Sequence, residues 1–149
     1  MNAFVVAAVF STLSFYCLGA GLMEHFAVDR TWPHVGEREF PLVHSVGGKA
    51  TMIVYVAPLL ALLCFTIVLF WVRPTGIAVG LVWASLTCHV VTWVSSAFIQ
   101  IPIQMKIDKR KDMVLIERLI RTDWIRIAAL VAHTAVAVGM LYQLSRSFG

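Results

Sequence analysis

The sequence predicts an all-α protein, a bundle of four transmembrane helices, because it is strongly apolar and contains four long segments without charge. Of its 149 residues, 60% are hydrophobic and 13% are charged, a balance that a soluble domain of this size does not have. The uncharged segments are 3–23, 51–72, 76–105 and 127–145. Each is close to or above the roughly 20 apolar residues that cross a bilayer core. We expect one domain over residues 1–149, with helices at about 3–24, 44–72, 77–101 and 113–146.

The first apolar segment lies where a secretory signal would lie. It lacks a basic region before it, however, and it is longer than the roughly 7–15 apolar residues of such signals, so we expect a retained helix. The three cysteines, Cys17, Cys64 and Cys88, all fall in apolar segments and form no CxxC pair. This spacing argues against a quinone-linked disulfide oxidoreductase and favours small buried side chains.

Basic side chains are distributed unequally between the two ends of the predicted bundle. The end with both termini carries only Arg73 and Arg146, and the other ten of the 12 Lys and Arg residues lie at the opposite end. The positive-inside rule places that opposite end in the cytoplasm and both termini on the non-cytoplasmic side. All eight acidic residues lie at the same end as these ten basic residues. The chain has a net charge of +4, and the face with these residues carries charges of both signs and lies beside anionic lipid. We expect no nucleic-acid partner.

The segment 115–141 begins with charged residues and continues as an apolar rod, with no proline and no glycine before Gly139. Asp112 stands where it can cap a helix that starts near residue 113, and Trp124 falls where interfacial aromatic residues are expected. We therefore predict one helix that begins at the cytoplasmic interface and enters hydrocarbon from about residue 127.

Each predicted helix gathers polar or small side chains on one face, at the roughly 100° per residue of an α-helix. These faces are Cys17, Gly21 and Glu24; His44, Gly48, Thr51 and Tyr55; Ser85, His89, Thr92, Trp93, Ser96 and Gln100; and Asp123, Arg126 and His133. Polar residues join membrane helices, and ionisable groups at membrane depth are costly enough to indicate function. We predict that the four faces meet in a polar pocket in the cytoplasmic half of the bundle.

Candidate functional residues come from this predicted pocket. The candidates for proton transfer are Glu24, His44, Asp123 and Arg126, with His44–Glu24 and His89–Asp123 as pairs that could take a proton from a phenol. The further predicted pocket residues are Tyr55, Ser96, Gln100, Gln104 and Trp124. The first connection, 24–44, mixes aromatic residues with charge and is predicted to form an interfacial lid. No two histidines stand at i,i+3 or i,i+4 spacing, so no metal site is predicted.

Two segments carry a resemblance to known proteins. The first is WPHVGEREFPLVHSVG, from Trp32 to Gly47, and the second runs from Thr92 to Arg126 and includes QIPIQMKI and LIERLIRTDWIR. They resemble a group of small bacterial four-helix membrane proteins of unassigned function, which is distantly similar to the anthrone-oxygenase-like family. Relatives carry Asn where this chain has Asp123. The resemblance implies a multi-pass protein of the bacterial inner membrane, and the distant family implies cofactor-independent oxidation of polycyclic aromatics.

Three functions stay open on the sequence. The chain fits an accessory or ligand-binding subunit that holds a hydrophobic small molecule, or that packs in a larger membrane complex or homo-oligomer. It also fits a membrane oxidoreductase or oxygenase acting on an aromatic or quinone-like substrate. The third function is a haem or other tetrapyrrole-binding subunit, with His89 and His133 as axial ligands from neighbouring helices. The cofactor is therefore unassigned, with haem and quinone as the two candidates.

Overall fold

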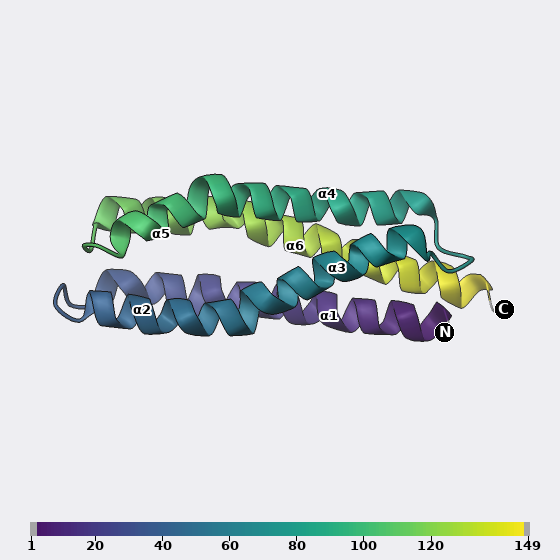
Figure 1. Cartoon of the computed structure of the whole chain (residues 1–149), viewed down its shortest axis with the longest axis horizontal. Helices are drawn as coiled ribbons and strands as arrows, with labels where there is room; N and C mark the ends of the chain where they lie inside the picture. The colour runs from purple at the N-terminus through teal and green to yellow at the C-terminus, as the bar shows by residue number, and fades with distance from the viewer. Residues whose placement is uncertain (1–2, 148–149) are drawn as a thin grey trace.

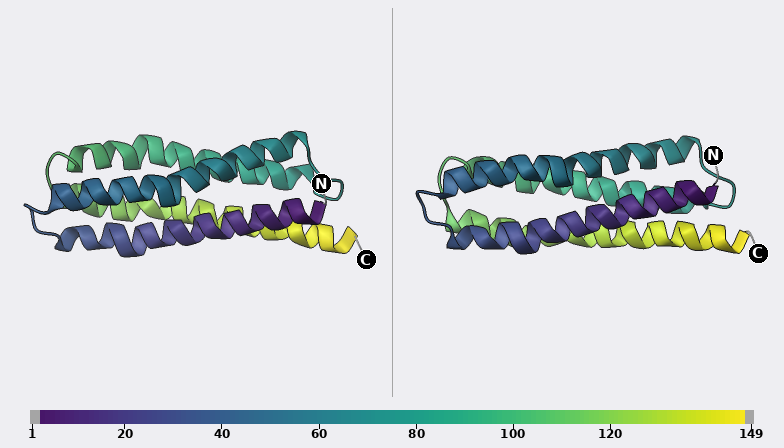
Figure 2. Two further views of the ribbon diagram at one scale, coloured as in Figure 1. Left: turned by 60° about the horizontal axis from the view of Figure 1, so that its bottom comes forward. Right: turned by 90° about the horizontal axis from the view of Figure 1, so that it is seen from below.

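Four helical rods form the computed structural model, which describes residues 3–147 (Figure 1). The rods are Ala3–His34, Phe40–Trp71, Val79–Ile107 and Met113–Arg146, and each is long and apolar enough to cross a membrane. They run side by side along the long axis of the molecule, as both further views also show (Figure 2). The described part of the chain contains no strand. The predicted all-α bundle of four apolar helices is therefore confirmed.

Two ends of the bundle differ in what they carry. The terminal end holds both ends of the chain and the connection at 72–78, and the charged end holds the connections at 35–39 and 108–112 (Figure 1). Lys111 joins these two connections, because its Nζ donates to the carbonyl oxygens of Pro33 at 2.8 Å and Val35 at 2.5 Å. It thereby satisfies carbonyl groups at the end of the first rod, which have no partner within their own helix.

Three of the four rods are interrupted by a π-helical turn between their middle and the charged end. The first rod consists of α1 (Ala3–Met23), the π turn η1 (Glu24–Val28) and the 3-10 segment η2 (Asp29–His34). The second consists of α2 (Phe40–Thr51), the π turn η3 (Met52–Val56) and α3 (Ala57–Trp71). The third consists of α4 (Val79–Ser95), the π turn η4 (Ser96–Gln100) and α5 (Ile101–Ile107), and the fourth is the single helix α6 (Met113–Ser147). Single π turns inside helices often mark functional sites.

A proline follows two of these π turns, Pro58 after η3 and Pro102 after η4. Proline has no backbone N–H, so the carbonyl four residues earlier loses its usual helical partner. For Pro58 that carbonyl belongs to Val54, and it accepts a hydrogen bond from the hydroxyl of Tyr16 at 2.9 Å. The proline therefore creates an acceptor that fastens the second rod to α1.

Many polar side chains lie inside the bundle beside its apolar core, while large apolar side chains stand on its surface. Large apolar side chains stand more than half exposed on the outside, among them Leu42, Ile53, Trp71, Phe98 and Val114. Hydroxyl, amide and charged side chains are buried instead, including Ser11, Ser14, Thr66, Ser85, His89, Thr92, Ser95, Gln100, Asp123, Arg126, His133 and Thr134. This arrangement is opposite to that of a soluble protein and is typical of a bundle surrounded by lipid.

Apolar packing is divided between two clusters. The cluster toward the terminal end includes Phe10, Leu62 and Met140, and the ring of Phe10 meets that of Phe65 edge-on at 5.5 Å. The cluster at the charged end consists of Trp32, Phe40, Ile103, Ile107, Ile116 and Leu119. The polar groups of the molecule lie between and beside these clusters.

The predicted lid is wrong, since most of residues 24–44 is helical. The first helix, predicted to end near residue 24, continues to His34, and the second begins at Phe40 rather than near residue 44. Trp32 and Phe40 are buried in the cluster at the charged end, and this burial holds both extensions in place. At α6 the prediction is confirmed, because Asp112 Oδ1 accepts the backbone N–H groups of residues 114 and 115 at 3.0 and 3.2 Å.

Candidate functional site

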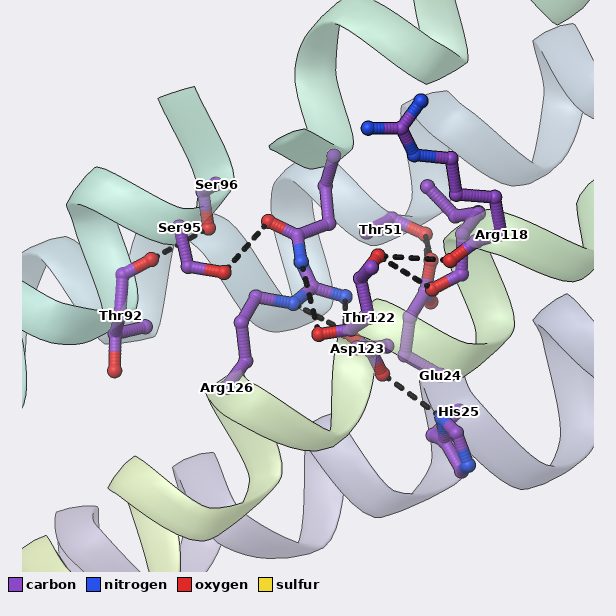
Figure 3. Close-up of polar contacts among 12 residues, drawn as sticks. Glu24, His25, Thr51, Thr92, Ser95, Ser96, Arg118, Thr122, Asp123 and Arg126 are labelled. Carbon is purple, nitrogen blue, oxygen red and sulfur yellow. Dashed lines mark hydrogen bonds and ion pairs between the residues drawn. The ribbon is translucent and has the colours of Figure 1, made fainter. Parts of the chain in front are cut away.

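A buried group of charges lies in the charged half of the bundle, where η1 meets α6 (Figure 3). Asp123 is fully buried and stands between two partners: its Oδ2 contacts His25 Nδ1 at 2.9 Å, and its Oδ1 forms an ion pair with Arg126 on the next turn of α6. Helical spacing explains the second contact, because residues three apart lie on one face. Asp123 therefore joins the first rod to the fourth.

Two further carboxylates belong to this group. Asp29 is 1% exposed, and neither of its oxygens has a hydrogen-bond partner within residues 3–147. Glu24 accepts hydrogen bonds from the hydroxyl of Thr51, at 3.0 and 2.9 Å to its two oxygens. Three buried carboxylates thus face one guanidinium, that of Arg126. We call Glu24, His25, Asp29, Asp123 and Arg126 the charge cluster.

Aromatic rings close the charge cluster on its outer side. The ring of His25 meets those of Phe26 at 4.8 Å and Trp124 at 4.7 Å. Trp124 itself is 47% exposed. Its predicted place in the pocket is therefore wrong, since its indole covers the charge cluster from outside.

A cavity of about 290 Å³ lies next to the charge cluster, between the second and third rods. Its lining residues are Glu24, Trp32, His44, Gly48, Thr51, Met52, Tyr55, Val56, Leu59, Trp93, Ser96, Ile101 and Gln104. Met52 and Ile101 are also exposed on the outside of the bundle, so the cavity opens between η3 and α5. We call this space the inter-rod cavity. Among the predicted pocket residues it contains Glu24, His44, Tyr55, Ser96 and Gln104.

Trp93, one of the residues that line the inter-rod cavity, carries a buried hydrogen-bond donor without an acceptor among the described residues. The indole Nε1 of Trp93 is inaccessible to solvent and has no partner in the described part of the chain. A Trp N–H that is buried usually finds a partner, because its desolvation is otherwise uncompensated. An acceptor supplied from outside the protein would satisfy it.

A second, larger cavity of about 500 Å³ lies on the other side of α2, against α1. Its wall is mainly apolar and includes Tyr16, Gly19, Met23 and Gly47. Glu24, Thr51 and Tyr55 line both this cavity and the inter-rod cavity. The Glu24–Thr51 hydrogen bond therefore stands between the two spaces.

His89 and His133 are both buried and face each other, with ring centroids 4.6 Å apart. His89 Nε2 bonds the hydroxyl of Thr66 at 3.1 Å, and His133 Nε2 bonds that of Ser85 at 2.7 Å. Two axial ligands of a haem stand on opposite faces of the macrocycle with iron between them. Rings in direct contact leave no room for it, so a haem would require these helices to move apart. The haem hypothesis stays a prediction.

In neither predicted proton-transfer pair do the two side chains bind each other among the described residues, although Glu24 and His44 both line the inter-rod cavity. Glu24 bonds Thr51, and His44 instead contacts Asp108 at 3.1 Å in the neighbouring connection. His89 lies beside His133, and Asp123 binds His25. Such contacts depend on how far one helix is shifted along another, which the sequence of a single helix does not encode.

Gln100 also differs from its predicted role. Its side-chain oxygen accepts from Ser95 Oγ at 3.1 Å, and its amide nitrogen donates to the Thr122 carbonyl at 3.4 Å. It therefore links η4 to α6 and lies outside the lining of the inter-rod cavity.

His25 and Asp29 are not among the functional residues predicted from the sequence. Both lie in the segment that was predicted to be a loop, so their helical relation was not considered. The signal was present, because residues 25 and 29 have the i,i+4 spacing that places two side chains on one helix face. Their charge suggested exposure, whereas both side chains are buried.

No protein-family model, curated protein or solved structure matches the chain. The resemblance to anthrone-oxygenase-like proteins therefore stays a prediction. The fold and the site define a helical bundle with four candidate membrane spans, a buried charge cluster and an adjacent cavity.

Proposed function

We propose that this chain is a multi-pass protein of the bacterial inner membrane that binds a hydrophobic small molecule with a hydrogen-bond-accepting head, of the quinone or aromatic carbonyl class. The observation that carries the proposal is that Trp93, which lines the inter-rod cavity, has a buried Nε1–H without an acceptor among the described residues. A carbonyl oxygen of the ligand accepts this hydrogen bond. The protein acts as a ligand-binding or accessory subunit for such a molecule.

The shape of the inter-rod cavity supports this class of ligand. Ligand sites are mainly apolar with a few convergent polar groups, and their volumes begin at roughly 300 Å³. The volume of about 290 Å³ suits one substituted ring, and the side chains of Val56 and Leu59 offer it apolar contacts. The opening beside Met52 and Ile101 faces the apolar outside of the bundle. A tail on the ring therefore extends into lipid.

A membrane redox reaction is the second candidate, and Glu24 is the observation that favours it. Glu24 lines the inter-rod cavity and also belongs to the charge cluster, where it interacts with Arg126. Reduction of a quinone to a quinol takes two electrons and two protons; the electrons would come from a redox-active partner subunit, and a carboxylate at the cavity wall is placed to pass protons to a ligand oxygen. In this role Glu24 would act as the proton donor to the bound ring.

Replacement of Trp93 by phenylalanine tests the binding proposal. Trp93→Phe keeps an aromatic ring but removes the N–H donor, so a bound carbonyl loses one hydrogen bond. We expect the Kd for a short-chain ubiquinone to rise about 2–10-fold, which corresponds to about 0.5–1.5 kcal/mol. Binding is measured with the protein in nanodiscs, after subtraction of the quinone that partitions into empty nanodiscs.

Trp83→Phe is the matched control for this experiment. Trp83 lies on the same helix, is 55% exposed and does not line the inter-rod cavity. The control variant is expected to bind like the unchanged protein. Equal affinities of the two variants, or no saturable binding by the unchanged protein, would contradict the proposal.

The orientation is part of the proposal, with the charged end in the cytoplasm and both termini on the opposite side. Ten of the 12 basic residues lie at the charged end, and the positive-inside rule assigns such an end to the cytoplasm. Single cysteines at Glu37→Cys and Thr75→Cys, in a chain whose native cysteines are replaced by alanine, test it. A membrane-impermeant maleimide is expected to label position 75 in intact spheroplasts and position 37 only after permeabilisation. The reverse pattern would show that the bundle is inserted the other way.

A further inference from the structure

The charge cluster holds more negative charge than its own residues neutralise. Glu24, Asp29 and Asp123 are 7%, 1% and 0% exposed, and the guanidinium of Arg126 contacts only Asp123 through an ion pair. A buried ionised carboxylate without a partner is strongly unfavourable, so such groups in proteins are paired, protonated or bound to a metal. A proton on Asp29 or an additional cation beside it is therefore needed.

Three members of the charge cluster have the geometry to share one cation. Single ligand atoms of His25, Asp29 and Asp123 all lie within 4.8 Å of one another. Imidazole nitrogen and carboxylate oxygen bind a transition metal at about 2.0–2.2 Å, so two ligands on opposite sides of the ion stand about 4 Å apart. The separations of up to 4.8 Å are close to this distance, so a shared ion requires only a modest approach of the three side chains.

The hydrogen bonds around His25, Asp29 and Asp123 are also those expected of a metal site. Asp29 Oδ1 and Oδ2 are both buried and lack a partner within residues 3–147. His25 Nδ1 and Asp123 Oδ2 share a hydrogen bond of 2.9 Å, and a cation placed between them replaces the shared proton. The other oxygen of Asp123 is held by Arg126, which fixes the carboxylate as an outer partner of a metal ligand does.

We propose that His25, Asp29 and Asp123 form a binding site for a divalent transition metal, with the remaining coordination positions taken by water or an added ligand. One nitrogen and two oxygen donors suit Zn²⁺, Fe²⁺ or Mn²⁺. Cu⁺ prefers sulfur ligands, while Ca²⁺ and Mg²⁺ prefer oxygen alone. The proposal goes beyond the ligand-binding function and does not depend on it.

Titration of the full chain in detergent with Co²⁺ and then with Zn²⁺ tests the site. Co²⁺ in a nitrogen–oxygen site absorbs visible light, so we expect a saturable spectrum at about one Co²⁺ per chain, lost when Zn²⁺ replaces it. A metal that binds only the folded chain raises the melting temperature, by roughly 5–10 °C at a hundredfold excess over Kd. Both readouts are independent of any quinone.

Asp29→Asn distinguishes a metal site from a merely structural cluster. Asparagine has the same shape as aspartate but no charge, so the metal-free variant is expected to melt at or above the temperature of the unchanged protein. The same variant is expected to lose the Co²⁺ spectrum and at least tenfold in affinity. Glu117→Gln removes one carboxylate from the exposed face of α6 and is expected to bind metal normally.

Two outcomes would overturn the proposal. One is the absence of saturable Co²⁺, Zn²⁺ and Mn²⁺ binding by the unchanged protein, which would assign the excess charge of the cluster to bound protons. The other is metal binding that Asp29→Asn and His25→Gln leave unchanged, which would place the ion elsewhere on the chain. If the unchanged protein binds metal but does not bind quinone, that result would contradict the proposed function and leave the metal-site proposal intact.

Discussion

Asp123→Ala is expected to lower the free energy of unfolding by about 3–5 kcal/mol, the range found when one partner of a buried ion pair is removed. The side chain of Arg126 is 10% exposed and forms its ion pair with Asp123. Removal of that carboxylate takes away the ion-pair partner of Arg126 and, among carboxylates, leaves it only the interactions with Glu24 and Asp29. It also frees His25 from its only hydrogen bond to a side chain among the described residues. Unfolding is measured in detergent with EDTA present, so that any bound metal does not contribute.

The double variant Asp123→Leu with Arg126→Leu separates the cost of an unpaired charge from the value of the pair. Replacement of a buried ion pair by apolar residues is often neutral, so the double variant is expected to be more stable than Asp123→Ala alone. A loss below about 1 kcal/mol in Asp123→Ala would mean that water reaches Arg126 in the folded protein.

Gly48→Phe is expected to weaken the binding of a short-chain ubiquinone by roughly a hundredfold, because overfilling a packed site costs up to about 3 kcal/mol. Gly48 lines the inter-rod cavity, and a Cβ atom added there meets no other atom within 4 Å. A phenylalanine side chain therefore fits at this position without a clash at its Cβ, and we expect its ring to enter the space proposed for the ligand. Binding is measured in nanodiscs, and the melting temperature of each variant is recorded beside it.

The neighbouring residue provides a matched control. Gly47 also has no atom within 4 Å of an added Cβ, but it lines the larger cavity against α1. Gly47→Phe is expected to retain ubiquinone binding. If Gly47→Phe loses binding while Gly48→Phe keeps it, the ligand lies between α1 and α2 instead of in the inter-rod cavity.

Helical periodicity was sufficient to predict which faces of the rods point inward. His89, Asp123, Arg126 and His133 were placed on inward faces from spacing alone, and all four are buried. The inference holds because the repeat of an α-helix is fixed by its backbone. Polar residues in an apolar rod also stand out clearly, so their common face is easy to recognise.

Partners across helices could not be predicted in the same way. His25 with Asp123, and His44 with Asp108, depend on the tilt and relative shift of two rods. The ends of the first two rods also differ from the prediction, because charge alone does not mark the end of a helix. Helices extend beyond an apolar span when residues such as Trp32 and Phe40 find a second cluster to pack in.

The hydrogen bond between Glu24 and Thr51 lies in the wall that the two cavities share. These two side chains, which line both cavities, act as a partition between a compartment of about 290 Å³ and one of about 500 Å³. With the partition closed, a guest in the smaller compartment is limited to about one ring. If the threonine hydroxyl turned away, this hydrogen bond would be lost, and we expect the bundle then to admit a larger molecule.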